Sequence, residues 1–299
     1  MFFVFKIIET VPNFSEGRDE AVIIKIADCF KNVTDVKLLD VKPDKDHNRT
    51  VVTAIGDPAP LKECIYKAFD VAIKNIDLTK HKGEHPRMGA VDVVPFIPVR
   101  NSDMKECVAL AKEVAQHVAE KFALPIFLYE AAASNVERQN LANIRKGEFE
   151  GFGEKIKDPK WKPDFGPCKI HPTAGATVIG AREYLIAFNI NLATSDIKIA
   201  DKIARAVRGS SGGLVNVKAM GVELSGRGIV QVSMNMVNHK KTPLFRAFEM
   251  VRSEAERYGV NVVGSEIIGL TPMEALITCA DHFLKIENFE MKQIIENNL

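Results

Sequence analysis

Two strand-like runs follow one another directly in residues 214–237, which read LVNVKAMGVELSGRGIVQVSMNMV. Their apolar and β-branched residues predict one strand over 214–224 and a second over 228–237. The flanking sequence predicts a strand at 184–192 and a helix at 196–208 before this pair, and a helix at 243–258, a strand at 260–264 and a helix at 272–284 after it. The order strand-helix-strand-strand-helix-strand is that of a ferredoxin-like split β-α-β unit.

The first half of the chain repeats this order. It is expected to contain strands at 3–10, 36–41, 49–55 and 91–98 and helices at 18–31 and 59–75, followed by a helix at 103–122 and a strand at 126–130. Asp57-Pro58 marks one helix start, and Ser102-Asp103 with Glu106 marks another as a capping box. The order of elements therefore predicts an α/β (α+β) protein of two ferredoxin-like β-α-β-β-α-β subdomains, although no residue-level repeat accompanies it.

The composition is that of an ordinary globular chain. Its 299 residues allow two domains, and 40 Lys and Arg against 39 Asp and Glu leave a formal net charge of +1, which excludes a bulk attraction to nucleic acid or to an anionic membrane. No apolar run approaches the roughly 20 residues of a spanning helix, and the apolar amino terminus is read as a first strand because it lacks a basic segment and a cleavage site. Five cysteines without a C-x-x-C pair favour a reduced, cytoplasmic location.

Residues 147–180 differ from their surroundings, because Gly and Pro recur too often for a continuous helix or strand. A loop of this length is more often functional than idle. It carries Trp161, the only tryptophan, beside Phe165, so we expect it to pack along the junction of the two domains. An ordered connector without a ligand is the alternative.

The densest group of chemically active side chains lies in residues 80–89, which read KHKGEHPRMG. The two histidines and the intervening glutamate match the zinc pattern H-x-x-E-H, but Gly83 and Pro86 disfavour the helix that this pattern requires. Without zinc, a histidine here can act as a general acid and base near neutral pH, and Arg87 can bind a carboxylate. Two solvated loop histidines are the alternative.

Two further segments are weaker candidates. Asn13, in the run Asn-Phe-Ser-Glu-Gly, follows the first strand and precedes a helix, where a ligand site and an ordinary helix cap are equally expected. Residues 175–182, GATVIGAR, lack both the lysine and hydroxyl residue of a phosphate loop and the glycine spacing of a dinucleotide-binding loop. Nucleotide binding is therefore weakly supported.

Six of these motifs, in this order, resemble the glutamate formimidoyltransferase family. They are VPNFSEG at 11–17, NRT at 48–50, GEHPRMGA at 83–90, WKPDFGP at 161–167, GAT at 175–177 with GAR at 180–182, and AFNIN at 187–191. The likeness extends from Val11 to about Leu276 and so covers almost the whole chain.

The resemblance implies transfer of a formimidoyl group from N-formimidoyl-L-glutamate to N5 of tetrahydrofolate, a step of histidine breakdown, with tetrahydrofolate as co-substrate and no metal. It also implies two subdomains, 1–182 and 183–299, whose sheets face each other across a folate-binding tunnel, and association as a homodimer.

The family's catalytic histidine falls on His85, which Glu84 is expected to orient, with Arg87 as the partner of a substrate carboxylate. Asn13 is a further candidate binding residue. The folate-binding segment of the family falls on Gly166, Pro167, Cys168, Lys169, Ile170, His171, Pro172, Thr173, Ala174 and Gly175.

Other functions remain open at this point. The sequence does not separate formimidoyl transfer from formyl transfer between 5-formyltetrahydrofolate and glutamate, nor an enzyme from a folate-binding protein without turnover. A metallopeptidase has the least support. Vertebrate members of the family carry a cyclodeaminase domain, and because this chain ends at Leu299, we expect a separate cyclodeaminase to process the product.

Overall fold

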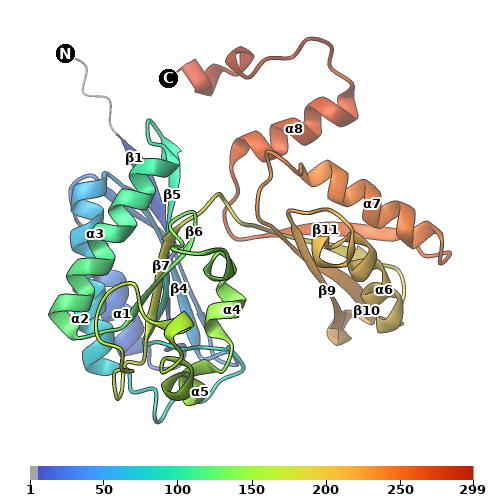
Figure 1. Ribbon diagram of the computed structural model, residues 1–299. Coiled ribbons are helices and arrows are strands. Elements are labelled where there is room, and N and C mark those ends of the chain that lie inside the picture. The colour runs from blue at the N-terminus through green and yellow to red at the C-terminus, as the bar shows by residue number, and fades with distance from the viewer. Residues whose placement is uncertain (1–5, 299) are drawn as a thin grey trace. The chain divides into compact units, whose positions relative to one another are not determined.

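The computed structural model describes residues 6–298, which form two compact units (Figure 1). The first unit ends at Arg182 and the second begins at Glu183. Each contains one sheet with helices packed on it, which confirms a mixed α/β class. Residues 3–5 of the expected first strand lie outside the described residues. None of the helices in residues 6–298 is long and apolar enough to cross a lipid bilayer.

The first unit is built on a four-stranded antiparallel core. Its strands are β1 (Ile7–Thr10), β3 (Val36–Asp44), β4 (Arg49–Gly56) and β5 (Val91–Arg100), and its helices are α1 (Glu20–Asp28) and α2 (Pro58–Asn75). β1 pairs with β4 on one side and β5 on the other, and β3 pairs with β4, so the strand order is β5-β1-β4-β3. This order confirms the split β-α-β arrangement. The short strand β2 (Asn13–Phe14) follows β1 and also pairs with β4 and β5.

A parallel extension widens this sheet. It consists of α3 (Met104–Phe122), β6 (Ile126–Glu130) and β7 (Thr177–Ala181), with β7 parallel to both β5 and β6 and lying between them. The expectation of irregular chain throughout 147–180 was therefore wrong for β7, whose five residues are all buried. Gly180 was read as part of a glycine loop, but it is a strand residue whose Cβ would lie 2.4 Å from a ring carbon of Tyr129. A buried strand needs no alternation of polar residues, so the sequence carried little sign of it.

Helices cover the two faces of the first sheet unequally. α1, α2 and α3 bury one face in a large core that includes Phe14, Phe69 and Phe96. On the other face, α4 (Leu141–Arg145) and α5 (Glu148–Lys155) pack over Val93 of β5, Phe127 of β6 and Val178 of β7. Trp161 joins this smaller core, with the Lys155 Nζ 4.0 Å from the centre of its ring. The face that carries α4 and α5 is the one that holds the candidate site described below.

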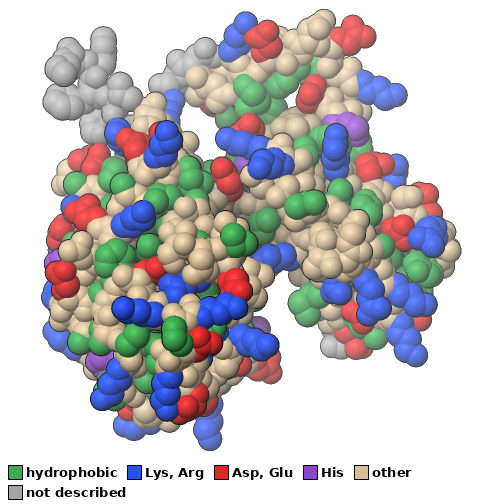
Figure 2. Space-filling model, viewed as in Figure 1, with side chains coloured by type: hydrophobic (Ala, Val, Ile, Leu, Met, Phe, Trp, Pro, Cys, Tyr) green, Lys and Arg blue, Asp and Glu red, His purple; other side chains and the backbone are tan. Residues whose placement is uncertain are grey.

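The second unit has the same strand order as the core of the first. Its elements are β8 (Ile186–Leu192), α6 (Ile197–Val207), β9 (Val217–Leu224), β10 (Ile229–Met236), α7 (Leu244–Glu256), β11 (Val262–Ile268) and α8 (Met273–Leu284). The antiparallel order β11-β8-β10-β9 confirms the second ferredoxin-like unit, and Ile229 opposite Leu224 closes the predicted hairpin. On the face shown in Figure 2, Lys and Arg side chains are interspersed with Asp and Glu, as expected from a net charge of +1.

Candidate active site

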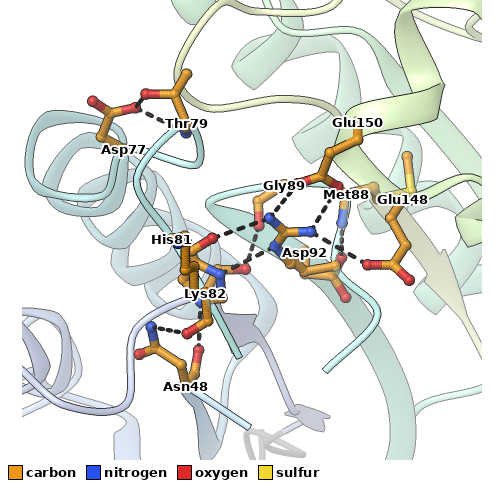
Figure 3. Close-up of polar contacts among 12 residues, drawn as sticks. Asn48, Asp77, Thr79, His81, Lys82, Met88, Gly89, Asp92, Glu148 and Glu150 are labelled. Atoms are coloured by element: carbon orange, nitrogen blue, oxygen red, sulfur yellow. Dashed lines mark hydrogen bonds and ion pairs between the residues drawn. The ribbon is translucent and has the colours of Figure 1, made fainter. Parts of the chain in front are cut away.

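The loop between α2 and β5, residues 76–90, is held in place from two sides. Asn48, which precedes β4 in a left-handed conformation (φ 48°), accepts a hydrogen bond at Oδ1 from Gly17 N (2.9 Å) and donates one from Nδ2 to Lys82 O (3.1 Å; Figure 3). Ser15 Oγ donates to Gly89 O at 2.7 Å. The loop that follows β2 and the loop that carries the two histidines are therefore fixed to each other.

His81 and Arg87 form the structural centre of this loop. The His81 ring bonds to Asn48 O through Nε2 (2.8 Å) and accepts from Arg87 Nε at Nδ1 (3.1 Å), which requires the neutral tautomer protonated at Nε2. Burial lowers the pKa of His81, in agreement with a neutral ring. Arg87 binds both carboxylate oxygens of Glu150 (2.7 and 2.9 Å) and one of Glu148 (3.3 Å), and also donates to His81 O (Figure 3). All five of its N–H donors thus have acceptors within the protein.

This geometry bears on the role expected for Arg87. Its guanidinium is 7% exposed and ties the start of α5 to the histidine loop through Glu148 and Glu150. Binding of a substrate carboxylate by Arg87 stays a prediction, and it would require Glu148 and Glu150 to release the guanidinium.

His85 is a buried, neutral imidazole. The residue is 6% exposed, and its Nε2 lies 3.6 Å from Asp92 Oδ2, slightly beyond hydrogen-bonding distance. Burial lowers the pKa of His85 and outweighs the opposing effect of the Asp92 carboxylate. A ring that is neutral at pH 7 can accept a proton, and a neighbouring carboxylate can then stabilise the imidazolium.

Asp92 is the carboxylate that lies beside His85. It is 1% exposed on β5, its Oδ1 accepts from Met88 N at 2.8 Å, and its Oδ2 forms an ion pair with Arg145 at the end of α4. Burial by itself would raise the pKa of Asp92, but Arg145, His85 and the Met88 N–H together hold it below its usual value. Sequence reasoning missed Asp92 and Arg145. The available signal was an acidic residue near the start of an apolar strand, directly after the histidine motif.

The expected orienting residue, Glu84, lies elsewhere. Its side chain is exposed, and its backbone N donates to Asp46 O at 3.2 Å. Glu84 follows Gly83, which lies against His47 O and Asn48, so the chain turns here and directs residue 84 to the surface.

Asn13 and Arg49 share the sheet face that carries α4 and α5. Asn13 pairs with Val51 on β4 and with Val93 on β5, and Arg49 lies two residues before Val51. Because side chains alternate along a strand, both point to the face of Val93. Asn13 Nδ2 donates to Val11 O at 3.0 Å.

The segment 166–175 meets the histidine loop at its far end. Gly166, Pro167, Cys168 and Lys169 are exposed, whereas Ala174 and Gly175 are buried. Gly175 (φ +72°) pairs with Gly89, and a Cβ on Gly175 would lie 2.1 Å from Met88 O. The two stretches singled out from the sequence are therefore adjacent, joined backbone to backbone.

A tight turn shapes the end of this segment. His171 and Gly175 exchange backbone hydrogen bonds of 2.9 and 3.0 Å, and the His171 Nδ1 accepts from Ala174 N at 2.9 Å. Burial lowers the pKa of His171, as expected for a ring whose Nδ1 must stay unprotonated. Ala90 N donates to Ala174 O, which continues the contact with the histidine loop.

The zinc interpretation finds no helix to support it. Residues 81–88 are irregular, with a bend at Glu84 and His85, so the two histidines do not share a helical face. In the part of the chain that the structure describes, no group of three or more His, Cys, Asp or Glu side chains is arranged to hold a metal ion.

Comparisons with known proteins cover both units. One family model, described as "Formiminotransferase domain, N-terminal subdomain", matches residues 7–182, and another, "Formiminotransferase domain", matches residues 187–298. A glutamate formimidoyltransferase of Streptococcus pyogenes serotype M1 is 52% identical over 98% of this chain and 99% of its own, and one of Thermoplasma acidophilum is 45% identical over 98% and 97%. The formimidoyltransferase-cyclodeaminase of Mus musculus is 44% identical over 92% of this chain and 52% of its own.

Proposed function

The chain belongs to the formiminotransferase family, and we propose that it transfers the formimidoyl group of N-formimidoyl-L-glutamate to N5 of tetrahydrofolate, releasing L-glutamate. Support comes from two relatives at 45% and 52% identity, both named glutamate formimidoyltransferase and both matched over nearly their whole length. Tetrahydrofolate is a co-substrate in this reaction, consumed and released in each turnover.

His85 is the group that moves the proton. N5 attacks the formimidoyl carbon, the new C–N bond forms, and the resulting tetrahedral intermediate must lose the N5 proton. The same proton is required by the departing glutamate nitrogen when the old C–N bond breaks. A single imidazole can accept it and return it. The observation that carries this role is a buried His85 ring, kept neutral by burial, within 3.6 Å of the Asp92 carboxylate.

Asp92 positions His85 and stabilises its charged form. Because Asp92 faces Nε2, the ring would hold its N–H towards the carboxylate and present Nδ1 as the base. The link from carboxylate to imidazole to substrate follows the logic of a catalytic triad, without a protein nucleophile. Arg145 and Met88 N keep the Asp92 carboxylate ionised for this purpose.

The binding roles follow from the same surroundings. We assign folate contacts to Gly166–Gly175 because this segment is partly exposed and ends in backbone contact with Met88–Ala90, next to His85. Asn13 lies on the neighbouring strand and belongs to the same site. Glu84 and Arg87 have supporting roles at most in this scheme, since Glu84 is exposed and Arg87 is bound by Glu150.

Two wider expectations belong to this proposal. Relatives named formimidoyltransferase-cyclodeaminase combine two activities in one chain, so we propose that a cyclodeaminase consumes the 5-formimidoyltetrahydrofolate made here. We also expect the protein to be a homodimer, which light scattering of the purified protein would test.

The test is direct. Purified protein is incubated with N-formimidoyl-L-glutamate and tetrahydrofolate, and glutamate release is followed together with the 5-substituted folate. We expect turnover in the wild type and a loss of about 100-fold or more in kcat for His85→Ala. His117→Ala removes an exposed histidine of α3 and serves as the matched control, with activity retained. Tight tetrahydrofolate binding without any turnover would instead indicate a folate-binding protein.

A further inference from the structure

Two arginines next to His85 have unused hydrogen-bond donors. Arg49 begins β4, and Arg145 ends α4. Within residues 6–298, the Nε of each is buried and has no hydrogen-bond partner. Unsatisfied donors of this kind are rare in folded proteins and mark a place where a ligand or an ion completes the bonding.

The charges around these arginines do not balance. Asp92 is shared among Arg145, Met88 N and the His85 ring, so it has little left to offer Arg49. The other carboxylate close to Arg49 is Asp44, which accepts from His47 Nδ1 and from two backbone N–H groups.

The remaining carboxylates of the site, Glu148 and Glu150, are bound to Arg87. Two buried guanidinium groups thus share one committed carboxylate beside a neutral His85. Arg49 shows the consequence: burial lowers its pKa, and repulsion by Arg145 lowers it further. An incoming anion would relieve both effects.

We propose that Arg49, assisted by Arg145, binds the α-carboxylate of N-formimidoyl-L-glutamate and so selects the donor; this rests on the proposed function. In this donor the α-carboxylate is attached to the carbon that bears the reacting nitrogen. A base positioned for that nitrogen therefore has the α-carboxylate as a near neighbour. The carboxylates of tetrahydrofolate are at the opposite end of that molecule from N5, so they do not reach the same place when N5 is beside His85.

The geometry of guanidinium groups suits this assignment. Nε–H and one Nη–H of an arginine form a side-on fork that matches the two oxygens of a carboxylate. In Arg145 the Nη2 is already used by Asp92, so Arg49 is the residue that can offer the fork to the substrate. Arg145 contributes its charge and its remaining donor.

The experiment is a cycle of two proteins and two donors. The wild type and Arg49→Gln are each assayed with N-formimidoyl-L-glutamate and with N-formimidoyl-4-aminobutanoate, which lacks only the α-carboxylate. We expect the wild type to favour the complete donor by about 100-fold in kcat/KM, and Arg49→Gln to reduce this preference to less than about 5-fold. The KM for tetrahydrofolate should stay within about 2-fold of the wild-type value.

Controls separate the possible failures. Arg100→Gln, an exposed arginine at the far end of β5, should keep the full preference. Arg49→Lys keeps the charge without the fork and should give an intermediate preference, which covers the case in which Arg49→Gln does not fold. Calorimetric titration of N-formimidoyl-L-glutamate into each protein gives a second readout that needs no turnover.

An undiminished preference in Arg49→Gln would overturn the assignment while leaving the proposed function intact. A wild type that turns over neither donor would overturn the proposed function itself. If the wild type turns over the glutamate donor but shows no preference between the donors, the carboxylate-binding role is refuted and the transfer activity stands.

Discussion

Replacing Asp92 by Asn tests whether the carboxylate beside His85 stabilises its imidazolium. At the observed separation of 3.6 Å, an imidazolium and a carboxylate attract each other by about 5 kcal/mol if the effective dielectric constant is about 20. Only part of this is realised in the transition state, because the proton is partly transferred there. We therefore expect kcat to fall by about 100- to 1,000-fold in Asp92→Asn.

The pH dependence gives a sharper sign. Burial already lowers the pKa of His85, and Asp92 opposes that effect. Without the carboxylate the pKa of His85 falls further, so the acid limb of the profile of log(kcat/KM) against pH should move to lower pH. The assay is initial-rate kinetics from pH 4.5 to 9 at saturating tetrahydrofolate, with folding checked at each pH by circular dichroism.

A matched variant separates catalysis from stability. Asp164 is also a buried carboxylate paired with an arginine, Arg138, at 2.8 Å. Asp92→Asn and Asp164→Asn each leave a buried guanidinium unpaired and should each cost about 3–5 kcal/mol of unfolding free energy. Only Asp92→Asn should shift the acid limb. An unchanged limb and an unchanged kcat in Asp92→Asn would refute the role given to this carboxylate.

Two further substitutions test the surroundings of the site. Gly175→Ala should lower the unfolding free energy by more than about 3 kcal/mol, because its Cβ would lie 2.1 Å from Met88 O, whereas Gly212→Ala, also at positive φ but in open space, should cost only about 1–2 kcal/mol; equal costs in urea titrations would contradict the close packing of the two segments. Burial raises the pKa of Glu9 to about 7 despite the nearby Arg182, so its ionisation costs the folded state free energy. Relative to Glu9→Gln, the wild type should lose about 3 kcal/mol of unfolding free energy between pH 4.5 and pH 7.5, with the loss complete once pH passes the folded pKa; a constant difference between the two proteins across that range would show that Glu9 is not buried in this way.

The elements with strong local signals were predictable. Asp57 caps α2 with Pro58 in its first turn, and Asp103 with Glu106 forms the expected capping box of α3. These signals are short-range hydrogen bonds between neighbouring residues, so they are legible in any window of sequence. The repeated order of strands and helices then limited the fold to the split β-α-β arrangement.

The missed strand and the missed carboxylate have a common cause. β7 is stabilised by parallel pairing with β5 and β6, whose residues are about 50 to 80 positions away in the sequence. Asp92 takes its meaning from Arg145, which reaches it from α4 over 53 positions. Neither pairing leaves a periodic pattern near the residues concerned, so reasoning from local windows could not detect them.

The sequence by itself therefore determined the type and order of the elements, the family, and the two segments 83–90 and 166–175 in which the candidate site lies. Only the tertiary structure decided which side chains meet there. Glu84, the carboxylate adjacent to His85 in the chain, turns to solvent, while Asp92, seven residues later, lies against the ring. The reason is that neighbours along an irregular loop point in different directions, whereas burial and backbone pairing bring distant residues into a common, low-dielectric environment.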